Sequence, residues 1–308
     1  MSRPSTFVPP PGVSARVIST PRGEFAALDT DGADRPDGPL RGTALLLPGF
    51  MGSKEDFIAL LLPLAARGYR TVAVDGRGQY ESAGPHDDPA PYAQEELASD
   101  VLAQRDALAA SGPGPVHLLG HSFGGHLARA AVLAEPAAFA SLTLMASGPA
   151  EISAPQRERV KLLRDALAVL DMGRVWEAMQ SLEAPAPEDA ATGAASADGS
   201  ATDADGSATD EAALRARWLR NSPAQILAAG RLLCTEPDRV PELAALPLPR
   251  HVISGERDET WPVPLLDEMA DRLAARRTVV VGAEHSPNTE RPAQTATALA
   301  DFWDAVPL

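Results

Sequence analysis

The pattern GHSFG at positions 120–124 matches G-x-S-x-G and contains the residue type best suited to covalent catalysis, Ser122. An apolar run at 116–120 precedes it and a helix-like stretch at 123–134 follows it. In that context the serine lies on a strained strand-to-helix turn that raises its hydroxyl above the edge of a sheet. The two glycines are needed because a side chain at either position would collide with neighbouring backbone. Ser122 is therefore the candidate nucleophile.

A serine hydroxyl needs a base within hydrogen-bond reach, and the base needs an orienting carboxylate. On this kind of turn the acid and then the histidine follow the serine along the chain. Of the six histidines, only His285 lies in a loop after the last predicted strand, so it is the candidate base. Asp258 precedes it by 27 residues, about the length of one helix and one strand. Glu256 and Glu259 in the same loop, and more remotely Glu151, remain alternatives as the acid.

The negatively charged intermediate of acyl transfer also needs backbone N–H donors. One donor is expected from Phe123, directly after the nucleophile. The other is expected from the loop at 48–53, where Phe50 is the candidate. Met51 in that loop and Trp261 near Asp258 are predicted to contact a substrate.

Motifs for cofactors and metals are missing from the sequence. The fragment at 49–54 lacks the G-K-[ST] ending of a phosphate loop, no G-x-G-x-x-G follows a predicted strand, and no H-E-x-x-H occurs. Cys234 is the only cysteine, which excludes an intramolecular disulfide and a multi-cysteine zinc site. The acidic run at 203–206 lacks two ligands of a calcium loop. We expect neither a cofactor nor a metal.

The elements that must position these residues alternate between strand and helix. Such alternation predicts a mostly parallel sheet with helices on both faces, an α/β fold. The predicted strands lie at 15–19, 24–29, 43–47, 71–75, 116–120, 142–147, 251–255 and 278–281. The predicted helices between and after them lie at 54–67, 92–111, 123–134, 263–274 and 292–306.

The segment 149–249 has no strand signal and interrupts this alternation. We predict a helical cap there, inserted into a core formed by 15–148 and 250–308 and preceded by a mobile arm at 1–14. The helix-like pieces of the cap lie at 155–172, 174–182, 211–220 and 224–234. A stretch at 184–210, rich in Ala, Asp, Ser and Gly, repeats ADGSATD in tandem and is predicted to be a disordered loop.

The charge composition limits the classes of partner that the chain can bind. The chain of 308 residues has 27 Lys and Arg against 42 Asp and Glu, giving a net charge of −15. This surplus disfavours nucleic acid and an anionic membrane surface as partners. No apolar run reaches the length of a membrane span or forms a signal peptide, so a cytoplasmic location is expected.

Five segments carry a family resemblance: LLLPGFMGS, VAVDGRGQYES, GHSFGG, SGERDETWP and GAEHSP. From about residue 15 to 308 the chain resembles the α/β-hydrolase superfamily, in the branch of capped serine hydrolases. The resemblance implies that a cap covers the serine and shapes the substrate pocket. Two positions depart from the family pattern: Pro48 replaces a frequent histidine, and Tyr80 replaces the second glycine of D-x-R-G-x-G-x-S.

Together these features predict a cofactor-free hydrolase that cleaves a small-molecule carboxylic ester with a modest apolar group. The reaction would pass through an acyl-enzyme on Ser122, with His285 as base and Asp258 orienting it. An acyltransferase or thioesterase with the same residues, and a ligand receptor on the same fold, remain alternatives. The sequence does not determine an oligomeric state.

Overall fold

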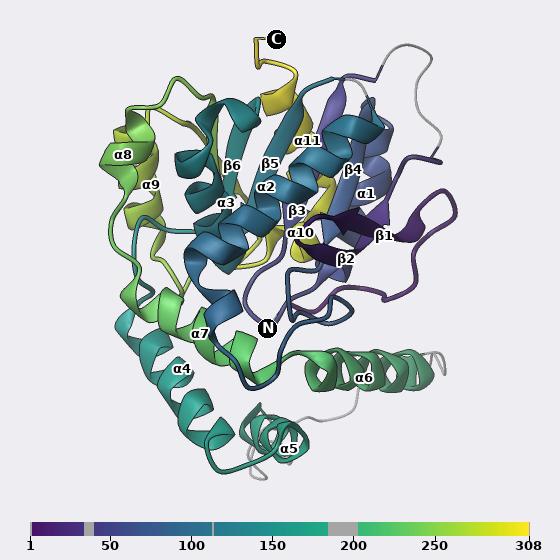
Figure 1. Cartoon of the computed structure of the whole chain (residues 1–308), viewed down its shortest axis with the longest axis vertical. Helices are drawn as coiled ribbons and strands as arrows, with labels where there is room; N and C mark the ends of the chain where they lie inside the picture. Colours follow the sequence, from purple (N-terminus) through teal and green to yellow (C-terminus); the bar gives the residue numbers. More distant parts are fainter. Residues whose placement is uncertain (1, 34–39, 113, 184–202, 308) are drawn as a thin grey trace, which may run out of the picture.

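The computed structural model of the chain describes residues 2–33, 40–112, 114–183 and 203–307 (Figure 1). Its centre is an eight-stranded sheet in the order β1-β2-β4-β3-β5-β6-β7-β8. β1 and β2 pair antiparallel, as do β2 and β4, and all the other pairs are parallel. The strands are β1 Ser14–Thr20, β2 Gly23–Asp29, β3 Gly42–Leu47, β4 Tyr69–Val74, β5 Val116–His121, β6 Ser141–Met145, β7 Arg250–Gly255 and β8 Arg276–Val280.

The central strands are apolar throughout because helices cover both faces of the sheet. Every residue of β3, β4, β5 and β6 is buried, whereas most of β1 at the edge is not. The predicted α/β fold class is therefore confirmed. The eight predicted strand positions also agree with the observed ones to within a few residues.

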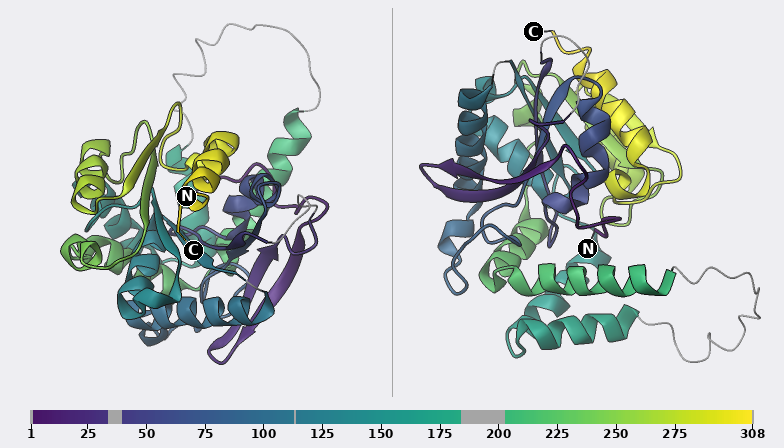
Figure 2. Two further views of the ribbon diagram at one scale, coloured as in Figure 1. Left: turned by 90° about the horizontal axis from the view of Figure 1, so that it is seen from above. Right: turned by 90° about the vertical axis from the view of Figure 1, so that its right-hand side faces the viewer.

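Two apolar cores lie on opposite faces of the sheet (Figures 1 and 2). One lies under α2 (Gln94–Ser111), α3 (Phe123–Ala134), α8 (Val240–Ala244) and α9 (Val263–Arg272). The other lies under α1 (Ile58–Ala65) and α11 (Pro292–Trp303). The 3-10 turn η1 (Lys54–Phe57) precedes α1, and the short helix α10 (Pro287–Glu290) precedes α11. No helix in the described part of the chain is long and apolar enough to cross a bilayer.

Between β6 and β7 the chain forms a helical insertion, by which we mean α4 (Ala154–Leu167), α5 (Met172–Glu183), α6 (Asp203–Arg220) and α7 (Pro223–Thr235). Figure 2 shows these helices at one end of the sheet. α6 begins at Asp203, not at 211, so the predicted loop at 184–210 ends earlier than expected. The aspartates at the start of α6 favour a helix N-terminus, where acidic residues are stabilised by the helix dipole. The rest of that predicted loop, 184–202, lies outside the described residues.

Candidate active site

Ser122 lies on a sharp turn between β5 and α3, as the sequence pattern predicts. Its backbone has φ 53° and ψ −118°, a conformation that is costly for a residue with a side chain. A Cβ at Gly120 would overlap the carbonyl oxygen of Gly124, and one at Gly124 would overlap that of Leu47. The turn is therefore packed backbone against backbone, which holds the serine in this strained conformation.

The structure brings Ser122, His285 and Asp258 into one hydrogen-bonded series. Nε2 of His285 lies 3.0 Å from Oγ of Ser122, and Nδ1 lies 2.9 Å from Oδ2 of Asp258. The three residues follow β5, β8 and β7, whose carboxyl ends meet at one edge of the sheet. Ser122 is 6% exposed, whereas the side chain of His285 is 31% exposed.

The carboxylate of Asp258 is fully buried and its two oxygens have different partners. Oδ1 accepts hydrogen bonds from the backbone N–H groups of Thr260, at 2.8 Å, and Trp261, at 3.1 Å. This arrangement fixes the carboxylate and leaves Oδ2 for His285. A carboxylate held in this way can keep the imidazole in one tautomer and orientation.

The other carboxylates considered from the sequence have partners elsewhere. Glu256 accepts from the N–H of Gly282, at 3.1 Å. Glu259 is exposed and forms a long ion pair with an arginine of α4. Glu151 pairs with Arg157, also in the insertion. Asp258 is thus the carboxylate that contacts His285.

The loop at 48–53 passes directly beside the nucleophile. A Cβ at Gly49 would lie 3.3 Å from the Cβ of Ser122. In the part of the chain that the structure describes, the backbone N–H groups of Phe50 and Phe123 have no hydrogen-bond acceptor. Two unpartnered N–H groups beside the serine are suited to an oxyanion.

Two residues that the sequence analysis did not assign support this geometry. Gln79 donates from Nε2 to the carbonyl of Gly49, at 3.0 Å, and accepts from the N–H of Gly76. His121 lies within the G-x-S-x-G pattern, and its Nε2 donates to the backbone carbonyl of His285, at 2.9 Å. Burial lowers the pKa of His121 to about 3, so its imidazole is neutral at pH 7. No motif or spacing marks either role, because both depend on contacts between distant loops.

The two predicted contact residues, Met51 and Trp261, lie in different environments. Phe50 and Met51 are half-buried and join an apolar cluster of the insertion. Trp261 has no exposed surface, and its indole N–H donates to the carbonyl of Ala150, at 3.0 Å. Its ring centre lies 6.3 Å from that of His285. Trp261 is thus enclosed beside the histidine, and its contact with a substrate stays a prediction.

A buried lysine ties the end of the 48–53 loop to the segment beginning at Asp75. Nζ of Lys54 lies 2.8 Å from Asp75 and 2.7 Å from Glu81. Burial raises the pKa of Asp75 to about 7, although the ammonium group of Lys54 opposes this shift. Tyr80, with φ 39°, places its ring against Lys54 and against Arg220 of α6. The aromatic replacement at position 80 thus links the core to the insertion.

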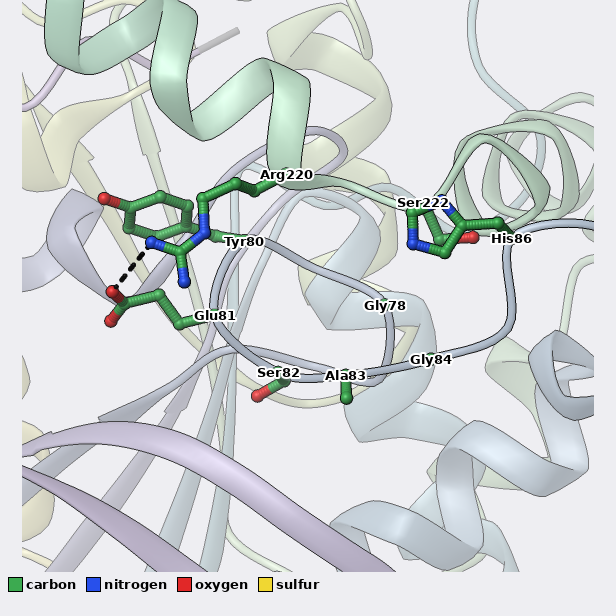
Figure 3. A pocket seen from close by; sticks show the side chains of 9 residues that line it. All are labelled: Gly78, Tyr80, Glu81, Ser82, Ala83, Gly84, His86, Arg220 and Ser222. Carbon is green, nitrogen blue, oxygen red and sulfur yellow. Dashed lines mark hydrogen bonds and ion pairs between the residues drawn. The ribbon is translucent and has the colours of Figure 1, made fainter.

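A cavity of about 240 Å³ lies on the outer side of this segment (Figure 3). No lining residue is Ser122, His285 or Asp258, or belongs to the 48–53 loop. The figure shows Arg220 paired with Glu81 and lying over Tyr80, so these polar groups already have partners. We do not assign the chemistry to this cavity. Its lining comes from the 78–86 loop and from the junction of α6 and α7, namely Gly78, Tyr80, Glu81, Ser82, Ala83, Gly84, His86, Arg220 and Ser222.

Comparison with known proteins places these features in a family context. A family model described as the alpha/beta hydrolase family matches residues 44–298. The pimeloyl-[acyl-carrier protein] methyl ester esterase of Aeromonas hydrophila subsp. hydrophila is 30% identical over 255 residues, covering 79% of this chain and 88% of that protein. A Variovorax paradoxus protein named as a carbamate hydrolase, RutD, is 35% identical over 135 residues. That match covers 44% of this chain and about half, 47%, of the relative.

Solved structures show the same architecture over nearly the whole chain. A thermophilic esterase from Thermogutta terrifontis superposes with a TM-score of 0.69, covering 95% of this chain and 99% of its own. The two sequences are 21% identical, so this similarity concerns the fold alone.

Proposed function

Because this chain belongs to the alpha/beta hydrolase family, we propose that it is a serine hydrolase that cleaves a carboxylic ester of a small to medium apolar molecule. The observation that carries the proposal is the hydrogen-bonded series from Ser122 through His285 to Asp258, with two unpartnered N–H groups beside the serine. A nucleophile, a base, an orienting acid and an oxyanion site are together the requirements of acyl transfer.

In the proposed mechanism Nε2 of His285 takes the proton of Ser122 as Oγ attacks the ester carbonyl carbon. The N–H groups of Phe50 and Phe123 stabilise the negative charge on the former carbonyl oxygen. His285 then gives its proton to the departing alkoxide, and the acyl group remains on Oγ. A water molecule, deprotonated by His285, attacks this acyl-enzyme and releases the carboxylic acid. Asp258 stays ionised and stabilises the imidazolium.

The preference for an apolar ester follows from the surroundings of the loop at 48–53, which we call the oxyanion loop. Phe50 and Met51 pack against a cluster of the insertion whose buried members are Val175, Trp176, Leu214, Trp218 and Ile226. In the proposed enzyme the insertion is a cap, and the apolar part of the substrate packs between it and the loop. The relative named as a methyl ester esterase supports an ester over other acyl compounds.

The test is hydrolysis of p-nitrophenyl esters from acetate to palmitate by the wild type and by Ser122→Ala. We expect the variant to lose at least about 10⁴-fold in kcat/KM, because the covalent route is removed. Ser181→Ala, at an exposed position in α5, is the matched control and should keep full activity. Unchanged turnover by Ser122→Ala would refute the mechanism. Burst kinetics with acyl transfer to added alcohols, in place of water, would favour a transferase.

A further inference from the structure

The segment preceding β1 lies against the proposed active site. In Figure 1 and in the right-hand view of Figure 2, this end of the chain lies between the sheet and α6. We call residues 2–8 the strap. Oγ of Ser2 lies 3.1 Å from Oγ of Ser286, the residue directly after His285. Pro4 is buried, although the strap belongs to no helix or strand. The start of the strap therefore lies next to the residue that follows His285.

A buried cation holds the strap in place. The side chain of Arg217, in α6, has no exposed surface and forms an ion pair with Asp56, at 2.7 Å. Its second terminal nitrogen donates to the carbonyl of Ser2, at 2.5 Å. Its guanidinium carbon also lies 5.5 Å from the ring centre of Phe7. Arg217 of the insertion thus contacts both Ser2, at the start of the strap, and the ring of Phe7.

Phe7 is the part of the strap that faces the apolar cluster. It is half-buried and packs against the cluster that also contains Phe50 and Met51. Its ring meets the ring of Tyr80 edge-on, with centres 6.4 Å apart. The next residue, Val8, is 73% exposed. A single aromatic side chain of the strap therefore packs against the same apolar cluster as Phe50 and Met51 of the 48–53 loop.

We propose that Phe7 is a specificity-determining residue, because the strap places its ring as one wall of the space that receives the apolar group of the substrate. The proposal rests on the proposed function. The ring limits the length or bulk of the group that fits between the oxyanion loop and the cap. Its removal opens room for larger groups without touching the nucleophile, the base or the oxyanion donors.

The first experiment compares kcat/KM for p-nitrophenyl acetate, butyrate and octanoate in the wild type, Phe7→Ala and Val8→Ala. We expect the ratio of octanoate to acetate to rise roughly 10-fold in Phe7→Ala, the usual scale for a change of pocket size. Val8→Ala, at the exposed neighbouring position, should keep the wild-type ratio. An identical ratio in all three proteins would overturn the proposal. Phe7→Leu, which keeps an apolar side chain, gives the same test at smaller amplitude should Phe7→Ala not fold.

A reversible crosslink tests whether the strap holds this position in the working enzyme. In a Cys234→Ser background, Ser2→Cys and Ser286→Cys would place two thiols where the hydroxyls are 3.1 Å apart. We expect the disulfide to form under mild oxidation. The kcat/KM values for the three p-nitrophenyl esters should be the same before and after reduction. No disulfide would show that the strap lies elsewhere. Loss of activity on oxidation, regained on reduction, would show that the strap must leave during turnover, and either result contradicts a fixed wall.

Covalent labelling separates failure of this inference from failure of the proposed function. Ethyl p-nitrophenyl methylphosphonate and its octyl analogue phosphonylate an activated serine without turnover, and mass spectrometry locates the adduct. The proposed role of Phe7 would be supported if the octylphosphonate labelled Ser122 faster in Phe7→Ala than in the wild type, while the methylphosphonate labelled both proteins at the same rate. Equal rates in the two proteins would refute the role of Phe7 alone. No labelling of wild-type Ser122 by either compound would refute the proposed function itself.

Discussion

The nucleophile turn and the helical insertion are held together in different ways. At the turn, glycines bring backbone against backbone, and Ser122 is strained within a buried sheet. In the insertion, α4 has no buried residue at all. Two buried ion pairs join this region to the core, Arg217 of α6 with Asp56, and Glu236, directly after α7, with Arg129, at 2.7 and 2.8 Å. α7 also packs Ala224, Ala229 and Leu233 into the core beside the sheet. The turn depends on close backbone packing among Gly120, Gly124 and Leu47, whereas the insertion combines apolar packing with charge pairs more than a hundred residues apart.

Under the proposed function, this difference means that catalysis and substrate specificity depend on different regions of the chain. A backbone-packed turn has little freedom to change, which suits a nucleophile whose position must be held closely. The insertion is attached through ion pairs and through apolar residues of α7, and its α4 has no buried residue, so it is held less tightly than the turn. Under the proposed function, the position of the nucleophile is set mainly by this turn, and specificity by contacts between the insertion and the core.

The largest expected effect is a loss of kcat when the acid that orients His285 is changed. Asp258→Asn should lower kcat for the best p-nitrophenyl ester by about 10⁴-fold, since an amide can hold the imidazole in the wrong tautomer. Glu256→Gln and Glu259→Gln change the same loop and are the matched controls, with activities near that of the wild type. Steady-state kinetics of the three proteins would measure this. A large loss in either glutamate variant would mean that the acid is misassigned.

The next effect is a loss of stability when the ion pair between the insertion and the core is broken. Arg217→Met should destabilise the protein by about 3–5 kcal/mol, because it leaves Asp56 buried without its partner. Asp56 also accepts from the N–H of Ser53 at the end of the oxyanion loop, so kcat should fall as well. Urea unfolding and ester kinetics would measure the two effects.

The controls for Arg217→Met distinguish a buried ion pair from an exposed one. Arg159→Ala breaks the 3.8 Å pair with Glu259, in which both side chains are mostly exposed, and should leave stability unchanged within error. The double variant Arg217→Met, Asp56→Leu should recover much of the lost stability, since neither charge remains buried. A single variant as stable as wild type would show that the insertion does not depend on this pair.

An effect that is smaller for each residue, set by pH, should fall on the sheet and spare the insertion. Burial lowers the pKa of His121 and His251 to about 3 and that of His117 to about 4. The unfolded chain binds these protons near pH 6.5 and the folded chain does not, so stability is full above pH 6.5 and falls as the pH decreases. We expect a loss on the order of 1–2 kcal/mol for each imidazole between pH 6.5 and 5.

Urea unfolding at a series of pH values would measure this dependence. His251→Leu should make it shallower, whereas His86→Gln, at an exposed position, should not change it. The helical insertion has no histidine in its sequence, so hydrogen exchange should accelerate in the strands before it does in α4 to α7. The opposite order would contradict the division between the two regions.

The parts of the fold with a short-range pattern could be predicted from the sequence. Apolar runs gave every strand, and the pattern around Ser122 gave the turn, since both signals lie within a few residues. The start of α6 at Asp203 was missed because tandem ADGSATD repeats have the composition of a loop. α8 was missed as well, since five residues are too few to show a helical period.

Within the candidate site, prediction stopped where contacts join distant segments. Ser122, His285 and Asp258 follow strand ends and could be placed by topology. Arg217 reaches Asp56 across 161 residues and Ser2 across 215, and no spacing marks such a pair. The burial of Trp261 was equally invisible, because an aromatic residue near a strand end can contact either the core or a ligand.

The insertion also separates the reactive groups in time. Ser122 and His285 are 163 residues apart, and the last strand that carries the histidine follows the whole insertion. During synthesis the segments nearer the N-terminus leave the ribosome and begin to fold first. The serine turn is therefore made before its base exists in the nascent chain. Under the proposed mechanism the polypeptide stays unreactive toward esters until β8 has docked beside β7, so reactivity reports that the last strand of the sheet is in place.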